Sequence, residues 1–309
     1  MYYPYLRAKQ YEMLALRDFI QYNTNDCGIM PILEPVKTTF NSLRLLLEAY
    51  KRANKKVGIV LNPEVGDLVG RKEIIESELD KFRDYYQPVF IISSSNIANI
   101  ATYLSTGNYR DVILLIPHSL TDEGNDLEEL ATSPYVTTII IKDPQRSIKR
   151  ALQKLSKKIV VLYDFFTKQE KNVDYLDVGE EFYTEEYWYY REEKFYGISD
   201  YTVLPSMYIE GGRLPYAVAI HLTYVKADKV NIRHFVSDSN DDTSNIQGKF
   251  AEAAKKAIEF CQTNKIASHG IDQLVNSYNE QHYPGLGSLK KISILHHLEL
   301  VSNIISKLQ

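Results

Sequence analysis

The sequence predicts an α/β protein built on a (β/α)8 barrel of the TIM type, with an N-terminal helix and a helical C-terminal extension. Short runs of β-branched residues recur between residues 29 and 222, and amphipathic or charged segments separate most of them. The runs are apolar throughout rather than alternating with polar residues. Strands show this pattern when helices cover both faces of a parallel sheet, which favours a barrel.

Eight runs have the length and composition of such strands. They are Ile29–Glu34, Val57–Leu61, Val89–Ile92, Val112–Ile116, Thr137–Ile141, Ile159–Tyr163, Tyr201–Leu204 and Tyr216–Leu222. A closed ring accommodates eight parallel strands, and crossover helices of the required length follow the first six. A doubly wound open sheet is the alternative, but no glycine-rich phosphate loop follows the first run.

Helices are predicted between the strands from apolar residues at three- and four-residue spacing. They are Phe40–Ala53, Glu73–Tyr85, Ile97–Leu104, Leu127–Ala131 and Ile148–Leu155. Arg7–Ile20 is a predicted helix before the first strand, where it could close the bottom of the barrel. A hairpin within Tyr224–Phe235 would carry the last strand past the rim.

Two further amphipathic helices, Gln247–Cys261 and Leu289–Leu308, are expected to pack on the barrel wall. No internal repeat or low-complexity linker interrupts the chain. We therefore predict one domain over residues 1–309, with an N-terminal helical part (1–28), the barrel (29–236) and a helical extension (237–309).

Composition narrows the function classes. The 309 residues carry a formal net charge of −4, which argues against nucleic acid as a primary ligand. Cys27 and Cys261 are too few for a disulfide framework and lack metal-ligand spacing, so both are expected to be buried small side chains. The N-terminus has no apolar leader, and no run approaches the roughly 18 apolar residues of a membrane span. The expected location is the cytoplasm.

Most candidate functional residues follow the predicted strands, because TIM-type barrels build their working face from those loops. Asp200 instead precedes the seventh predicted strand, and Tyr201 begins it. We take as catalytic candidates Glu34, Lys37, His118, Lys142 and Asp164, and as binding candidates Asn62, Asp143, Asp200 and Tyr201. The carboxylates could hold a divalent cation or supply a general base. The lysines and the histidine could neutralise a phosphate or carboxylate. Every barrel ends its strands in polar residues, so this pattern is also compatible with no reaction at all.

Other features have plainer interpretations. His221 lies within an apolar run and is expected to be a hydrogen-bonded core residue. Adjacent His296 and His297 would point about 100° apart on a helix, so they cannot both face one metal ion. Six of the 24 tyrosines lie within residues 182–201, where interspersed glutamates would repel nucleic acid. That segment is predicted to be a helix covering the barrel, with a partner-binding surface as the alternative.

Short motifs resemble an uncharacterised bacterial family related to the phage "beta protein" family. They are MYYPYLRAKQYE at residues 1–12, ILEPVK at residues 32–37 and GISDY at residues 197–201. The resemblance implies a barrel-like fold and an association with phages, mobile elements or antiphage defence. It implies no known activity and transfers no catalytic residue. Four candidates, Glu34, Lys37, Asp200 and Tyr201, gain weight because they lie inside the motifs.

Two functions follow as hypotheses. The first is a partner-dependent component of a bacterial phage-defence or mobile-element system, in which the barrel is a scaffold for a protein partner. The second is a barrel hydrolase acting on a phosphate ester through Glu34, Asp143 or Asp164 together with Lys37 or Lys142. The fold cannot choose between them, because it hosts many functions. Convergence of Glu34, Lys142 and Asp164 in one pocket would favour the hydrolase. Substrate and oligomeric state do not follow from the sequence.

Overall fold

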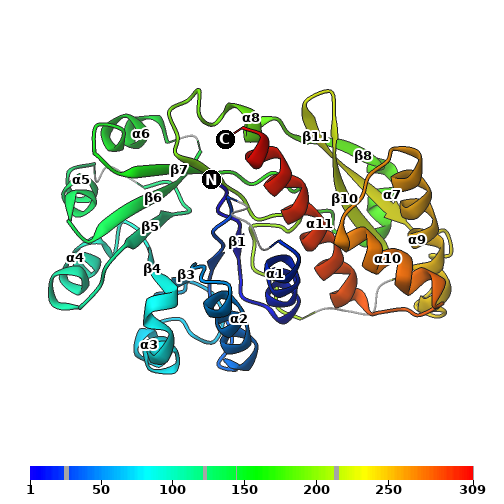
Figure 1. The fold of residues 1–309 in the computed structure, drawn as a ribbon, viewed down its shortest axis with the longest axis horizontal. Helices are drawn as coiled ribbons and strands as arrows, with labels where there is room; N and C mark the ends of the chain where they lie inside the picture. Colours follow the sequence, from blue (N-terminus) through cyan, green and yellow to red (C-terminus); the bar gives the residue numbers. More distant parts are fainter. Residues whose placement is uncertain (24–27, 121–123, 144, 212–215, 309) are drawn as a thin grey trace. The chain divides into compact units, whose positions relative to one another are not determined.

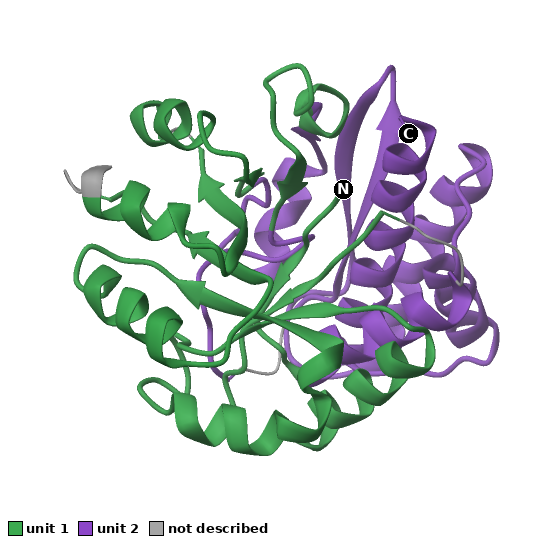
Figure 2. Cartoon of the chain, turned by 60° about the vertical axis from the view of Figure 1, so that its left-hand side comes forward, with its two compact units in different colours: residues 1–9, 28–164, 186–200 green, residues 10–27, 165–185, 201–309 purple. Residues whose placement is uncertain are grey.

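The computed structural model describes residues 1–23, 28–120, 124–143, 145–211 and 216–308. Its contacts divide the chain into two compact units, drawn in different colours in Figure 2. Unit 1 comprises residues 1–9, 28–164 and 186–200, and unit 2 comprises residues 10–27, 165–185 and 201–309. The expectation that residues 1–309 form one domain stays a prediction.

Unit 1 is the barrel. Among the described residues, eight strands form one sheet in which every pair is parallel. In sheet order they are β1 (Tyr5–Leu6), β2 (Ile32–Leu33), β3 (Val57–Val60), β4 (Tyr86–Ile91), β5 (Val112–Ile116), β6 (Val136–Lys142), β7 (Lys158–Leu162) and β9 (Gly197–Ser199). A parallel bridge between Tyr2 and Ile198 brings the two ends of the sheet together, so the barrel is nearly closed. The predicted fold class is confirmed.

Helices follow the strands of unit 1 and surround them (Figure 1). They are α2 (Asn41–Arg52), α3 (Lys72–Leu79) continued by the 3₁₀ helix η1 (Asp80–Tyr85), α4 (Ile97–Thr106), α5 (Gly124–Thr132), α6 (Arg146–Leu152) and the single turn α8 (Glu186–Tyr189). The buried face of α2 consists of Leu43, Leu46, Leu47 and Tyr50, as the helical spacing predicts. Helices on the outside explain why the strands are apolar on both faces.

The first strand of the barrel is the N-terminus itself, which the sequence pattern did not indicate. Tyr3 and Tyr5 donate backbone hydrogen bonds to Ile198 and Asp200, and Ile32 donates to Pro4 on the other side. The interpretation of residues 1–28 as a purely helical segment before the first strand was therefore wrong. Helix α1 (Gln10–Tyr22) does form, but it comes after β1.

Two predicted barrel strands were also wrong. Tyr201–Leu204 contains no strand; it is a turn in which Thr202 has a φ of 57°. The other, Tyr216–Leu222, supplies part of β10 (Ala219–Lys226), which pairs with β11 (Lys229–Val236) in an antiparallel hairpin. The hairpin itself is as predicted, and its turn residues Ala227 and Asp228 both have positive φ, as a tight type I′ turn requires.

Unit 2 is built around this hairpin. Among the described residues, β10, β11 and β8 (Glu180–Thr184) form a separate antiparallel sheet in that order. The helices of the unit are α1, the 3₁₀ helix η2 (Asn172–Asp174), the short α7 (Tyr175–Val178), α9 (Ile246–Thr263), α10 (His269–Asn279) and α11 (Leu286–Lys307). A buried apolar cluster joins Ile220, Leu222 and Phe235 of the sheet to Phe250 and Ala254 of α9. Thus α9 packs on the hairpin.

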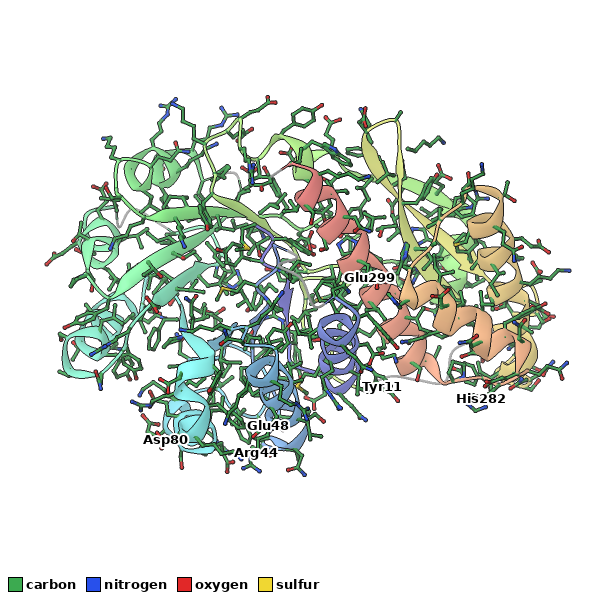
Figure 3. The ribbon with its side chains drawn as sticks, in the orientation of Figure 1. Tyr11, Arg44, Glu48, Asp80, His282 and Glu299 are labelled. Carbon is green, nitrogen blue, oxygen red and sulfur yellow. The ribbon has the colours of Figure 1, made fainter. Side chains whose placement is uncertain are left out.

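Helix α11 contacts both the other helices and the sheet of unit 2. It packs against α1, α10 and β10, and Lys290 and Lys291 pair with Glu12 and Asp18 of α1 at 2.9 and 2.8 Å. Glu299 of α11, labelled in Figure 3, lies 2.6 Å from His269 Nδ1 of α10. Helix α1 is therefore held within unit 2 by the last helix of the chain.

The tyrosine-rich segment is not the single helix predicted. Residues 180–184 form strand β8 in unit 2, while residues 186–189 form α8 and residues 197–199 form β9 in unit 1. Cys261 is buried at 2% exposure, as expected for a small core side chain, whereas Cys27 lies outside the described residues.

Candidate functional site

The C-terminal ends of the barrel strands carry most of the candidate residues, and Glu34 is fully buried among them. It follows β2 directly and its exposure is 0%. Tyr5 Oη donates to Glu34 Oε2 at 2.5 Å, Arg7 forms an ion pair with the same oxygen, and the Glu64 backbone N–H donates to Oε1 at 2.8 Å. Both carboxylate oxygens are thus engaged by donors from unit 1.

Asp200 has a similar environment at the end of β9. Its exposure is also 0%, Tyr2 Oη donates to Oδ1 at 2.6 Å, and Tyr187 donates to Oδ2. The two tyrosine rings meet edge to face with centroids 5.9 Å apart. A buried carboxylate is costly unless it is hydrogen-bonded, so these phenols stabilise Asp200 in place.

Polar side chains after β3 and β5 are tied to the backbone or to each other. The Asn62 amide donates to the Ile91 carbonyl and accepts from the Ile91 N–H, both at 2.8 Å, so it links β3 to β4. Glu64 Oε2 lies 3.0 Å from Nε2 of His118, an exposed side chain that follows β5. Of the predicted candidates, the structure therefore connects Glu34 to His118 through Glu64, which was not predicted.

Lys142 and Asp143 open onto a cavity at the ends of β6 and β7, here called the β6–β7 pocket. Its volume is about 220 Å³. The lining comprises Ile141, Lys142, Asp143, Gln145, Arg146, Lys149, Val161, Tyr163, Glu186, Glu193 and Phe195. Neither Glu34 nor Asp164 belongs to this lining, so the convergence of Glu34, Lys142 and Asp164 that would favour the hydrolase does not occur there.

Burial and nearby carboxylates raise the pKa values of two groups that line the β6–β7 pocket. Partial loss of hydration raises the pKa of Asp143, and the Glu193 carboxylate raises it further against the opposing effect of Lys149. Burial, followed by the charges of Glu186, Asp143 and Glu193, likewise raises the pKa of Tyr163. Tyr163 Oη remains protonated and donates to Glu186 Oε2 at 3.3 Å.

The remaining candidates lie elsewhere. Lys37 is exposed and forms an ion pair with Asp67 at 3.5 Å. Asp164 is exposed at the last residue of a segment of unit 1. Tyr201 is 6% exposed and belongs to unit 2. None of the three lines the β6–β7 pocket.

Unit 2 contains a larger groove, here called the hairpin groove, with a volume of about 770 Å³. It runs between the β10–β11 hairpin and the C-terminal half of α9. The aromatic floor consists of Tyr224, Phe235 and Phe260, and the Arg233 guanidinium lies 4.6 Å from the Phe260 ring centre. Lys226 and Arg233 share one carboxylate, that of Glu180, at 3.3 and 3.4 Å.

A histidine pair bridges the two strands of the same hairpin, and one member, His234, also belongs to the groove lining. His221 Nδ1 and His234 Nδ1 are 2.7 Å apart, and His234 Nε2 is 3.2 Å from Glu181 Oε1. Because His234 Nε2–H donates to the carboxylate, His234 Nδ1 accepts a hydrogen bond from His221 Nδ1–H. Burial, reinforced by His234, lowers the pKa of His221 to about 3. The expectation of a hydrogen-bonded histidine is met, although in unit 2 rather than in the barrel.

His296 and His297 contact different atoms of one residue, Thr223 of β10, and both are buried. His296 Nε2 lies 2.7 Å from the Thr223 carbonyl, and His297 Nδ1 lies 3.0 Å from Thr223 Oγ1. Both tie α11 to β10. Within the described residues, no group of three or more His, Cys, Asp and Glu side chains is arranged to hold a metal ion, and no helix is long and apolar enough to cross a membrane.

Sequence reasoning missed the partners of the carboxylates, above all Tyr2, Tyr5, Arg7 and Tyr187. The tyrosine content was the available signal, because a phenol combines an apolar ring with a polar end suited to half-buried sites. No model of a known protein family matches this sequence, and no curated protein matches it.

Proposed function

We propose that this chain acts by binding a protein partner, as the barrel-based component of a bacterial phage-defence or mobile-element system. The observation that carries the proposal is the burial of a carboxylate at the C-terminal end of a barrel strand. Glu34, one of the three carboxylates of the hydrolase hypothesis, is fully buried and accepts from Tyr5, Arg7 and the Glu64 N–H. A carboxylate engaged in this way is suited to supporting the fold.

The hairpin groove of unit 2 supplies a surface suited to a partner. Leu176 and Val225 line it and remain 47% and 45% exposed. Because Lys226 and Arg233 share the single carboxylate of Glu180, that side of the groove has one surplus positive charge. The partner we expect is an extended segment of another protein that places an apolar side chain on the aromatic floor and an acidic side chain beside Arg233.

The proposal is tested by expressing the chain with the products of its flanking genes in a bacterial host. Efficiency of plating is measured for a panel of phages, and complex formation is measured by size-exclusion chromatography with light scattering. Val225→Glu and Arg233→Glu should each abolish complex formation and restore plaques. Lys168→Glu, an exposed change outside the groove lining, should do neither.

Two results would contradict the proposal. One is equal plaque counts with and without the chain for every phage in the panel. The other is that both groove variants still form the wild-type complex while their melting temperatures match that of wild type. Val225 is exposed at the end of the hairpin, so its replacement tests the groove without removing a buried contact.

Phosphate-ester hydrolysis ranks second. It requires Glu34, Asp143 or Asp164 to act with Lys37 or Lys142 on one substrate. Of these residues, Lys142 and Asp143 share the β6–β7 pocket, while Lys37 pairs with Asp67 away from it. The lining of that pocket is also balanced in charge, which does not favour a ligand with two negative charges.

A further inference from the structure

The N-terminal ends of three barrel strands carry basic and aromatic side chains that the partner-binding proposal does not use. Strands β6, β7 and β9 are neighbours in the sheet and run parallel, so their first residues lie at one edge of it. Tyr135 directly precedes β6, Lys158 begins β7, and Tyr196 directly precedes β9. This is the end opposite the one that carries Glu34, Lys142 and the other strand-end candidates, so a role here is separate from theirs.

Contacts between the strands fix the order of these side chains. Lys157 Nζ donates to two carbonyls on either side of Tyr135 in the chain, at 2.8 and 2.6 Å. Lys158 Nζ lies 4.8 Å from the centre of the Tyr196 ring, and the Tyr196 N–H donates to the Ile159 carbonyl at 2.7 Å. The lysines therefore lie between two tyrosines whose strands are two ladder spacings, or roughly 10 Å, apart.

Helix α6 adds two exposed cations close to the start of β7. Arg150 belongs to the last turn of the helix, and Lys154 follows in the short connection to β7. Between Asp143 and Asp164 the chain has six basic residues and no acidic residue, although the whole protein has a net charge of −4. The set that lies near the start of β7, here called the basal patch, is Tyr135, Arg150, Lys154, Lys157, Lys158 and Tyr196.

The positive charge of the basal patch is not neutralised within the part of the chain that the structure describes. None of its four cations forms an ion pair with a carboxylate there. Glu193 comes close to α6, since its backbone carbonyl accepts from Gln153 at 3.1 Å, but its carboxylate is already paired with Lys149 at 2.6 Å. The patch therefore favours an anionic ligand.

The two tyrosines distinguish between anionic ligands. Tyr135 and Tyr196 are 40% and 42% exposed. Single-stranded nucleic acid is bound by cations that contact phosphates and by aromatic rings that stack on unpaired bases. A membrane surface would instead favour inserted aliphatic or phenylalanine side chains, but among the described residues of 133–158 and 194–198 these two tyrosines are the only exposed large apolar side chains.

We propose that the basal patch binds single-stranded nucleic acid. Arg150, Lys154 and Lys158 contact phosphates. Tyr135 and Tyr196 stack on bases to either side of the lysines. The net charge of −4 does not prevent this, because salt screens distant charges over about 10 Å at 0.1 M and leaves the local patch to act. The ligand is additional to the protein partner, whose groove belongs to unit 2.

Fluorescence anisotropy of the full chain tests the proposal, with labelled oligo(dT) and oligo(U) of about 16 nucleotides, the upper site size of common single-strand binders. At least one should bind at about 50 mM salt, and the two probes distinguish DNA from RNA. A fourfold increase in salt should weaken binding roughly 20-fold, as expected for three phosphate contacts. The double variant Lys154→Glu/Lys158→Glu should weaken binding by about tenfold or more, and Tyr196→Ala by about fivefold or more.

Matched controls make the same changes at exposed positions outside the patch. Lys255→Glu on α9 and Tyr189→Ala on α8 should bind as wild type does. Duplex DNA, poly-L-glutamate and phosphatidylserine vesicles are the comparison ligands, and each should bind more weakly than the single strand.

The proposal is overturned if neither oligonucleotide binds at about 100 μM protein, the weak end of non-specific affinities. It is overturned equally if a comparison ligand binds as tightly as the single strand. Wild-type binding by patch variants that keep the wild-type melting temperature would also exclude it, as would equal losses in the controls. None of these measurements involves the protein partner, so this inference and the proposed function can fail separately.

Discussion

Tyrosine hydroxyls hold the buried carboxylates of the barrel. Asp200 receives hydrogen bonds from Tyr2 and Tyr187, and Glu34 receives one from Tyr5. Burying a carboxylate is costly, and charge-assisted donors offset the cost while the rings fill apolar space. This use of phenols gives a structural reason for the 24 tyrosines of the sequence beside 11 phenylalanines.

Removing the Tyr5 hydroxyl tests whether Glu34 supports the fold. Tyr5→Phe keeps the buried ring and deletes the 2.5 Å hydrogen bond to Glu34. Hydrogen bonds to charged groups contribute about 1.5–3 kcal/mol, so we expect the free energy of unfolding to fall by about that amount. Urea denaturation followed by circular dichroism measures it.

Tyr135→Phe is the matched control, because Tyr135 is 40% exposed and its hydroxyl has no hydrogen-bond partner in the described residues. It should change stability by less than about 0.5 kcal/mol. A Tyr5→Phe variant as stable as wild type would show that Glu34 does not depend on this bond. Sequence reasoning placed Glu34 at the end of a strand and Asp200 just before one, and it could not supply the donors of either carboxylate. Tyr2 and Asp200 are far apart in sequence and meet only once the ring closes.

At the scale of elements, six barrel strands could be predicted because they have helices on one face and the barrel interior on the other. The same criterion misassigned Tyr216–Leu222. In unit 2, Ile220 and Leu222 of β10 face α9, while Thr223 contacts His297 of α11. An antiparallel strand covered on both faces has the same apolar pattern as a parallel one, so the pattern alone cannot reveal strand direction.

Strand β1, the true first strand of the barrel, was missed for the opposite reason. Residues 2–6 read YYPYL. A proline usually argues against a central strand, because it lacks the N–H that a β-ladder requires. Here Tyr3 and Tyr5 supply the donors toward Ile198 and Asp200, while the Pro4 carbonyl accepts from Ile32. The ladder tolerates Pro4 because Tyr3 and Tyr5 supply the donors on one side, while on the other side the Pro4 carbonyl still accepts a hydrogen bond.

The hairpin of unit 2 should make the protein sensitive to acid. Burial lowers the pKa of His221 from its ordinary 6.5 to about 3 and that of His234 in the same direction. Below pH 6.5 the unfolded chain binds protons that these folded histidines do not, so stability is full above pH 6.5 and falls as pH decreases toward 3. Each such histidine contributes a slope of roughly 1 kcal/mol per pH unit.

Urea denaturation of wild type and His221→Gln between pH 7 and pH 4 measures that slope. The glutamine amide can still donate to His234, and we expect the slope to decrease by about one proton's worth, or roughly 1 kcal/mol per pH unit. Exposed His282, labelled in Figure 3, is the control, and His282→Gln should follow the wild-type profile. Parallel profiles for His221→Gln and wild type would mean that the pair does not titrate as the geometry implies.

At the scale of the whole molecule, each compact unit is built from segments that are not consecutive along the chain. The chain passes between the units after residues 9, 27, 164, 185 and 200. Sequence reasoning divided it into consecutive parts with boundaries at residues 28 and 236, because periodicity reports on neighbours along the chain. Nothing in the α1 sequence indicates that its buried face, which includes Leu16 and Phe19, belongs with a helix that begins at Leu286.

Because α1 belongs to unit 2, a cavity in α11 should change the hydrogen-exchange rates of the α1 amides. Leu295 of α11 is fully buried, and Leu295→Ala should reduce the stability of unit 2 by about 2–5 kcal/mol. Because α1 packs on α11, hydrogen exchange should accelerate in residues 10–22 together with β10 and α9, and less in barrel strands β3–β6. Leu45→Ala, at a 53% exposed position of α2, is the control and should alter neither region. If α1 instead keeps its protection while α9 and α10 lose theirs, then α1 does not belong to unit 2 and the packing of the first helix on the last is wrong.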